Sequence, residues 1–131
     1  MNGILKIRAD QMAAFEGAVR SQIALEILDY LRLKVPDSIA GLDEAETTRR
    51  SEFAVNRAFA FGLTGDFYDT IVIWSRLMFT VGPYFDLHPA CEAILDEISA
   101  PPEMRVESLI HTRNQIPWEE VTEFCAKQEW N

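Results

Sequence analysis

Hydrophobic residues recur at steps of three and four positions along most of the chain, which is the spacing of one helical face. The first stripe follows Asp10, a residue that can cap a helix. It ends at Lys34-Val35-Pro36, because proline disfavours helical geometry in the residue before it. The stripe consists of Met12, Phe15, Val19, Ile23, Ile27 and Leu31. The spacing predicts a long amphipathic helix from Asp10 to the Lys34 region.

Two further helices are expected in the middle of the chain. The second runs from about Asp43 to Phe61, with Gly62 as a left-handed stop. Thr64 is then expected to cap a third helix, which Gly82-Pro83 ends. The apolar stripe of the third helix is wide, and it comprises Phe67, Ile71, Trp74, Met78 and Val81, flanked by Val72 and Leu77. Such a wide stripe predicts the central, most buried helix.

Shorter helices are expected in the last third of the chain. Pro89 fits the first position of a fourth helix, and Pro117 can start a sixth. A fifth helix follows the break at 99–102. Their expected core residues are Cys91, Ile94, Leu95, Ile98, Met104, Leu109, Ile110, Trp118, Val121, Phe124 and Cys125. No strand alternation competes, so we predict an all-α fold in which residues 1–131 form a single domain, an irregular bundle of five or six helices.

Length and composition are consistent with this fold. The 131 residues suit one domain, and 48% hydrophobic with 25% charged residues is ordinary globular composition. The N-terminus is charged too early for a signal peptide, and no apolar run approaches the ~20 residues that a membrane helix needs. Two cysteines, Cys91 and Cys125, are too few for a disulfide scaffold. We therefore expect a cytoplasmic protein with two buried, reduced thiols.

The net charge of −9 is distributed unevenly. Residues 1–65 hold nine acids and eight bases, whereas residues 66–131 hold twelve acids and four bases. The negative field of the second half would repel phosphate, which argues against nucleic acid and anionic membrane as partners. A basic protein surface is the natural complement, although an acid excess also simply keeps small proteins in solution.

The search for chemistry finds no catalytic, cofactor or metal site. Gly62-Leu63-Thr64-Gly65 lacks the third glycine and the lysine of a phosphate loop. The segment from Asp86 to Cys91 brings an acid, His88 and a thiol together in sequence, but His88 is better explained as the start of a helix. His111 is expected to be exposed, and neither Cys91 nor Cys125 has a general base nearby in sequence. An enzyme is therefore the least favoured reading.

Aromatic residues gather around the Gly82-Pro83 break. Most of them should be core, but Tyr84, Phe85 and Asp86 lie on a loop between two apolar helices. Exposed aromatic residues are favoured binding anchors, so these three residues are the predicted partner-binding site. Of Trp118 and Trp130, the second is expected to be the more exposed because it lies beside the C-terminus.

The order of several motifs resembles a family. These are Ile7 to Met12 before Phe15, Arg57-Ala58, the turn 61–64, and the segment 77–86, Leu-Met-Phe-Thr-Val-Gly-Pro-Tyr-Phe-Asp. Over about residues 7–98 the chain resembles small helical bacterial proteins encoded in type VI secretion clusters, beside effectors, adaptors and PAAR-spike proteins. The resemblance supplies no catalytic residues.

What the resemblance implies is a helper that loads or stabilises a secretion effector, as a co-chaperone or adaptor subunit. The alternative is an immunity protein that neutralises a cognate toxin, since such clusters encode these as well. Self-association through a helix face is compatible with either role. In each case the partner is a protein, with no cofactor.

Overall fold

The computed structural model describes the backbone of residues 2–131 and the side chains from Phe15 onward. It contains six α-helices, and no strand occurs between residues 2 and 131. Their bounds are α1 (Asn2–Lys34), α2 (Glu44–Phe61), α3 (Tyr68–Thr80), α4 (Pro89–Leu95), α5 (Pro102–His111) and α6 (Trp118–Ala126). Short 3-10 turns lie at η1 (Pro36–Ile39), η2 (Gly65–Phe67), η3 (Phe85–Leu87) and η4 (Arg113–Gln115). The predicted all-α bundle is confirmed.

Local signals set several helix ends as predicted. Asp43 caps α2, because its side chain accepts a hydrogen bond from the amide of Glu46 at 2.7 Å. Gly62 ends α2 with φ 117°, a backbone conformation that favours glycine. Lys34 ends α1 two residues before Pro36, and Pro89 begins α4. Each of these ends is determined by residues within one turn of it.

The predicted start of α1 is wrong. The helix begins at Asn2, so Asp10 lies inside it and its backbone amide and carbonyl need no capping partner. The segment before Asp10 is rich in good helix formers and continues the helix. The side chains of Asp10 and Met12 lie outside the part of the chain whose side chains are described. Phe15, predicted as core, is 70% exposed because the buried part of the stripe begins only with Val19 and Ile23.

The start of α3 also differs from its prediction. The side chain of Thr64 makes no capping hydrogen bond, and the 3-10 turn η2 separates it from α3. The carbonyl of Thr64 instead accepts the amide of Phe67 at 2.9 Å. The centre of the predicted stripe is confirmed, because Ile71, Trp74 and Met78 are fully or almost fully buried. Its two ends, Phe67 and Val81, lie outside α3 and are half-buried.

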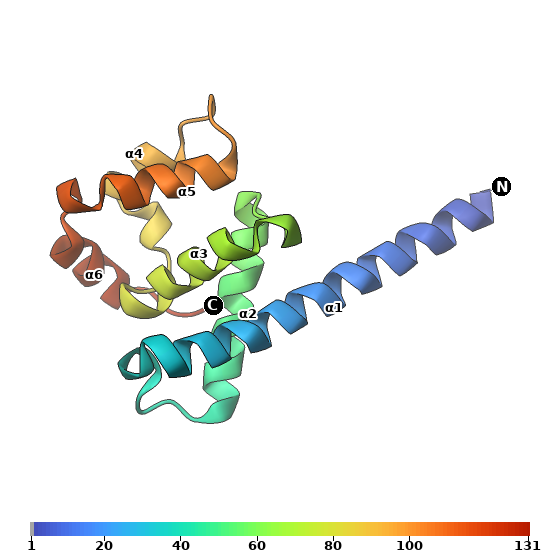
Figure 1. Ribbon diagram of the computed structural model, residues 1–131, viewed down its shortest axis with the longest axis horizontal. Helices are drawn as coiled ribbons and strands as arrows, with labels where there is room; N and C mark the ends of the chain where they lie inside the picture. The colour runs from blue at the N-terminus through green and yellow to red at the C-terminus, as the bar shows by residue number, and fades with distance from the viewer. Residues whose placement is uncertain (1) are drawn as a thin grey trace.

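The core lies around α3 (Figure 1). In that view α3 runs between α1 and α5, and α1 crosses α2. The α1–α2 crossing is fixed by a buried hydrogen bond, in which Ser51 Oγ donates to the carbonyl of Ala24 at 2.7 Å. The largest fully buried side chains are Trp74, Phe85, Ile27, Leu31, Leu63, Ile71, Met78, Leu95, Leu109, Val55, Val106 and Val121.

Three predicted burials near the C-terminal half are wrong. Ile98 is 85% exposed because α4 ends at Leu95, before it, and Met104 is 52% exposed on the first turn of α5. Trp130, expected to be more exposed than Trp118, is buried at 9% exposed, whereas Trp118 is only half-buried. Among the described residues, no helix combines the length and the hydropathy needed to cross a bilayer.

Candidate functional site

The predicted partner-binding loop is shaped by two unusual backbone conformations. After α3 ends, Gly82 has φ 141° and Tyr84 has φ 64°. Glycine adopts such positive values without strain, whereas other residues rarely do. The loop then tightens into η3, in which the carbonyl of Tyr84 accepts the amide of Leu87 at 2.9 Å. The chain therefore turns sharply here.

Phe85 points into the core, which contradicts its predicted role as a docking anchor. It is fully buried, and its ring centre lies 5.0 Å from that of Trp74. Trp74 in turn stacks on Phe61 at 5.0 Å. A large apolar side chain next to a buried tryptophan gains more from burial than from exposure on a loop. Phe85 is therefore a core residue that anchors the loop to α3.

Tyr84 and Asp86 are held by α2. Arg57 donates a hydrogen bond to Asp86 Oδ2 at 2.5 Å, and its guanidinium lies 4.3 Å from the ring centre of Tyr84. The hydroxyl of Tyr84 donates to the main-chain carbonyl of Asn131. Asp86 is 12% exposed and Arg57 is 25% exposed at their side chains. The partner-binding role of Tyr84 and Asp86 stays a prediction, with much of each side chain already engaged inside the molecule.

The C-terminal segment closes this region. Trp130 packs against Phe79 at 4.9 Å and against Phe53 at 6.0 Å between ring centres. Arg50 lies over the Trp130 ring at 5.1 Å, and Arg49 donates to the Trp130 carbonyl. The sequence contains no indication of this cluster, because Trp130 lies 51 to 81 positions from the residues that it contacts and no periodic signal connects them.

The cysteines are confirmed as buried free thiols. Burial raises the pKa of Cys91 to about 12 and that of Cys125 to about 11. A nucleophilic cysteine needs the opposite shift, since the thiolate is the reactive form. A raised pKa means that the folded state holds its thiol proton to higher pH, so these groups lower stability only as the pH rises above about 9.

The two histidines have different surroundings. His88 caps α4, because its Nδ1 accepts the amide of Ala90 at 3.1 Å, and its ring meets the Phe124 ring edge-on at 5.4 Å. His111 is exposed, as predicted. Within the described part of the chain, no three His, Cys, Asp or Glu residues gather as metal ligands would.

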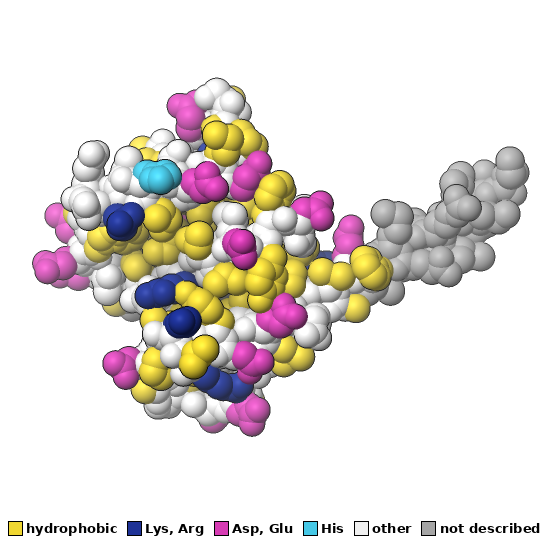
Figure 2. Space-filling model, viewed as in Figure 1, with side chains coloured by type: hydrophobic (Ala, Val, Ile, Leu, Met, Phe, Trp, Pro, Cys, Tyr) yellow, Lys and Arg dark blue, Asp and Glu magenta, His cyan; other side chains and the backbone are white. Residues whose placement is uncertain are grey.

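The acids of residues 66–131 face outward. Ten of these twelve are exposed, while Asp86 and Glu103 are half-buried. Of these twelve acids, Asp86 alone forms an ion pair with a described residue, Arg57. Acidic side chains are spread over the face seen in Figure 2. The negative charge of this half is therefore not neutralised by neighbouring bases, and it acts as a broad surface field.

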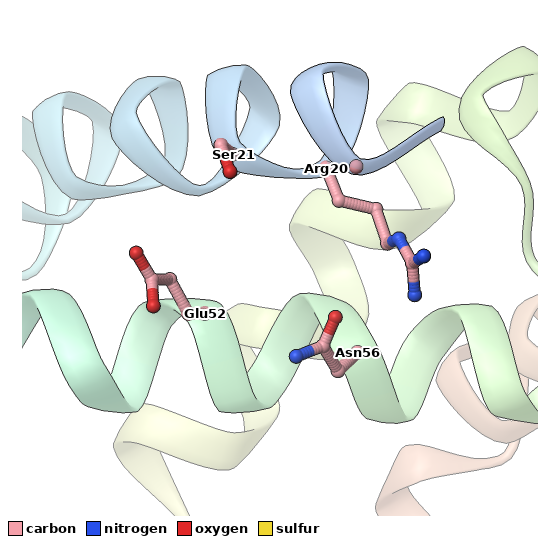
Figure 3. A pocket seen from close by; sticks show the side chains of 5 residues that line it. Arg20, Ser21, Glu52 and Asn56 are labelled. Carbon is pink, nitrogen blue, oxygen red and sulfur yellow. The ribbon is translucent and has the colours of Figure 1, made fainter. Parts of the chain in front are cut away.

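A polar groove separates α1 from α2 (Figure 3). It has a volume of about 310 Å³ and is lined by Gly17, Arg20, Ser21, Glu52 and Asn56. Figure 3 shows that side chains from the two helices project toward each other across the gap. Arg20 lies 5.4 Å from the ring centre of Phe59 and makes no ion pair with Glu52. The groove offers hydrogen-bond donors and acceptors, without a nucleophile and base in contact.

Gly17 is the glycine that lines this groove. A Cβ placed there would meet no atom within 4 Å. We expect Gly17→Ala to raise the free energy of unfolding by roughly 0.5–1 kcal/mol, because alanine is the better helix former and nothing obstructs it. Urea denaturation measures this change, with Ala18→Gly at the adjacent, exposed position of α1 as the reverse control. A destabilised Gly17→Ala protein would show that the α1–α2 crossing is closer than described.

No protein-family model, curated protein or solved structure matches the chain.

Proposed function

We propose that this protein is a non-enzymatic binding helper whose partner presents a basic protein surface. The observation that carries the proposal is the acidic surface of residues 66–131, where eleven of the twelve acids form no ion pair with a described residue and only four bases are present. Complementary fields accelerate association and select partners, while this field disfavours nucleic acid. The buried, protonated thiols add support, since their pKa values oppose nucleophilic chemistry.

The specific setting that we propose is type VI secretion, with the chain loading or stabilising an effector as a co-chaperone or adaptor subunit. The support for this setting is the motif order over about residues 7–98. An immunity protein that covers the basic face of a toxin is the second candidate, because the same acidic surface suits that role.

The first experiment identifies the partner and then measures how charge controls its binding. Tagged protein is captured from its native cells, the co-purified proteins are identified by mass spectrometry, and association is measured with the purified partner. We expect neutralising Glu119, Glu120 and Glu123 to glutamine to slow association several-fold at low salt, with the difference vanishing at high salt. All three acids are exposed on α6.

A matched variant neutralises three exposed acids in the other half, Glu16, Asp37 and Glu44. It should slow association less, although it removes the same charge. Equal effects, or no salt dependence, would contradict the acidic-surface proposal. Loss of effector delivery on gene deletion supports the helper role, whereas rescue from one specific toxin by co-expression supports the immunity role.

A further inference from the structure

A small apolar hollow lies on the outward side of α3, between α1 and α5. Its volume is about 280 Å³, and its walls are Tyr30, Ile73, Arg76, Leu77, Thr80 and Ile110. Figure 2 shows hydrophobic side chains gathered between α5 and α3 on this face, with Lys or Arg side chains at their edge. Three partly buried aliphatic side chains from two helices therefore form one wall of the hollow.

Arg76 places a positive charge at the edge of this hollow. Its guanidinium donates to the hydroxyl of Tyr30 at 2.9 Å, a neutral partner on α1. No acid among the described residues forms an ion pair with Arg76. Six of the ten bases with described side chains form no ion pair, and Arg76 is the one of these six that lines the hollow. Arg76 thus retains donors and an unneutralised charge for an incoming acceptor.

An apolar wall with one cation at its edge fits an amphipathic anion. Ligand sites are typically apolar with a few placed polar groups, and they span about 300–1,000 Å³. A volume of about 280 Å³, just below that range, suits a short chain rather than a large ring system. The net charge of −9 repels anions at long range, but this field is screened beyond about 8 Å at physiological salt. Whether an anion binds in the hollow therefore depends on its direct contact with Arg76.

We propose that the hollow between α1, α3 and α5 binds a short aliphatic carboxylate. The chain packs on Ile73, Leu77 and Ile110, and the carboxylate accepts hydrogen bonds from Arg76. This site is independent of the acidic surface that carries the proposed protein-binding role, so either can fail without the other.

Octanoate is the probe that tests this assignment, by calorimetry and by methyl NMR on the full chain. We expect one saturable site in the millimolar range, with shifts concentrated at the methyl groups of Ile73, Leu77 and Ile110. Octan-1-ol should bind about tenfold more weakly because it lacks the charge-assisted hydrogen bond. Butanoate should also bind more than tenfold more weakly, since each methylene it lacks removes apolar contact worth up to about fourfold in affinity.

Two matched variants distinguish direct binding by Arg76 from the general effect of removing one positive charge. Arg76→Gln should weaken octanoate binding about tenfold. Arg113→Gln makes the same charge change on an exposed arginine that bonds the Ile110 carbonyl at 2.9 Å but does not line the hollow, and it should leave affinity within about twofold. Absence of saturable shifts, shifts elsewhere, equal loss in both variants, or stronger binding of a leucine-terminated peptide than of octanoate would overturn the proposal. Thermal unfolding checks that both variants remain folded.

Discussion

Gly82→Ala is expected to lower the free energy of unfolding by about 4 kcal/mol, a large part of the stability of a typical small domain. Two effects combine at this position. Gly82 has φ 141°, which strains any residue that carries a Cβ. The added Cβ would also lie 2.4 Å from Cβ of Cys125, a contact that requires α6 or the loop to move. Chemical denaturation with circular dichroism measures the loss.

Gly41→Ala is the control that separates these two effects. Gly41 also has a positive φ of 83°, but a Cβ there would meet no atom within 4 Å. Gly41→Ala should lower the free energy of unfolding by only about 1–2 kcal/mol, which is the strain of the left-handed conformation alone. If the two variants were equally destabilised, the close approach of Cys125 to Gly82 would not exist in solution.

This packing explains why a short segment after α3 matters for the whole fold. Gly82 lets α6 approach at Cys125, while Phe85 fills the core beside Trp74. The sequence pattern correctly predicted a helix stop at Gly82-Pro83. It predicted a docking loop beyond that stop because aromatic content alone does not distinguish an anchor facing inward from one facing outward.

The parts of the fold that were predictable depend on local chemistry. Asp43 caps α2 and Gly62 ends it through contacts within a few residues, so single positions carry the information. Buried stripes such as Ile71, Trp74 and Met78 follow from helical spacing. The start of α1 was not predictable in this way, because a good capping residue such as Asp10 can also lie inside a helix.

The parts that were missed depend on contacts between distant positions. Trp130 is buried because it packs against Phe53 and Phe79, and neither lies within fifty positions of it in sequence. The apolar hollow likewise combines Tyr30 with Arg76, which lie 46 positions apart. A single sequence holds no signal for such pairs, since periodicity reports only which face of one helix is apolar.

The Arg57–Asp86 pair is the second place where one substitution should have a large effect. Asp86→Asn keeps the shape of the side chain but leaves the Arg57 charge, which is 25% exposed, without its counter-ion. Breaking a buried pair from one side costs about 3–5 kcal/mol, and the partial exposure here reduces this to about 2–3 kcal/mol. Arg57 Nε and Asp86 Oδ1 are already buried without hydrogen-bond partners. Few other hydrogen bonds are therefore available to offset the loss of the Arg57–Asp86 interaction. Equilibrium urea unfolding measures the change.

Two comparison variants define what this loss means. Asp29→Asn breaks an exposed pair with Arg32, in which Asp29 is 81% exposed, and should change stability by less than about 0.5 kcal/mol. The double variant Arg57→Met, Asp86→Leu removes both charges and should be more stable than Asp86→Asn alone, because no unpaired charge remains buried. That ordering would identify the pair as the attachment of the Tyr84–Asp86 loop to α2. An Asp86→Asn protein with unchanged stability would instead mean that the Asp86 carboxylate is free of Arg57 in solution, and its predicted role in partner binding would gain strength.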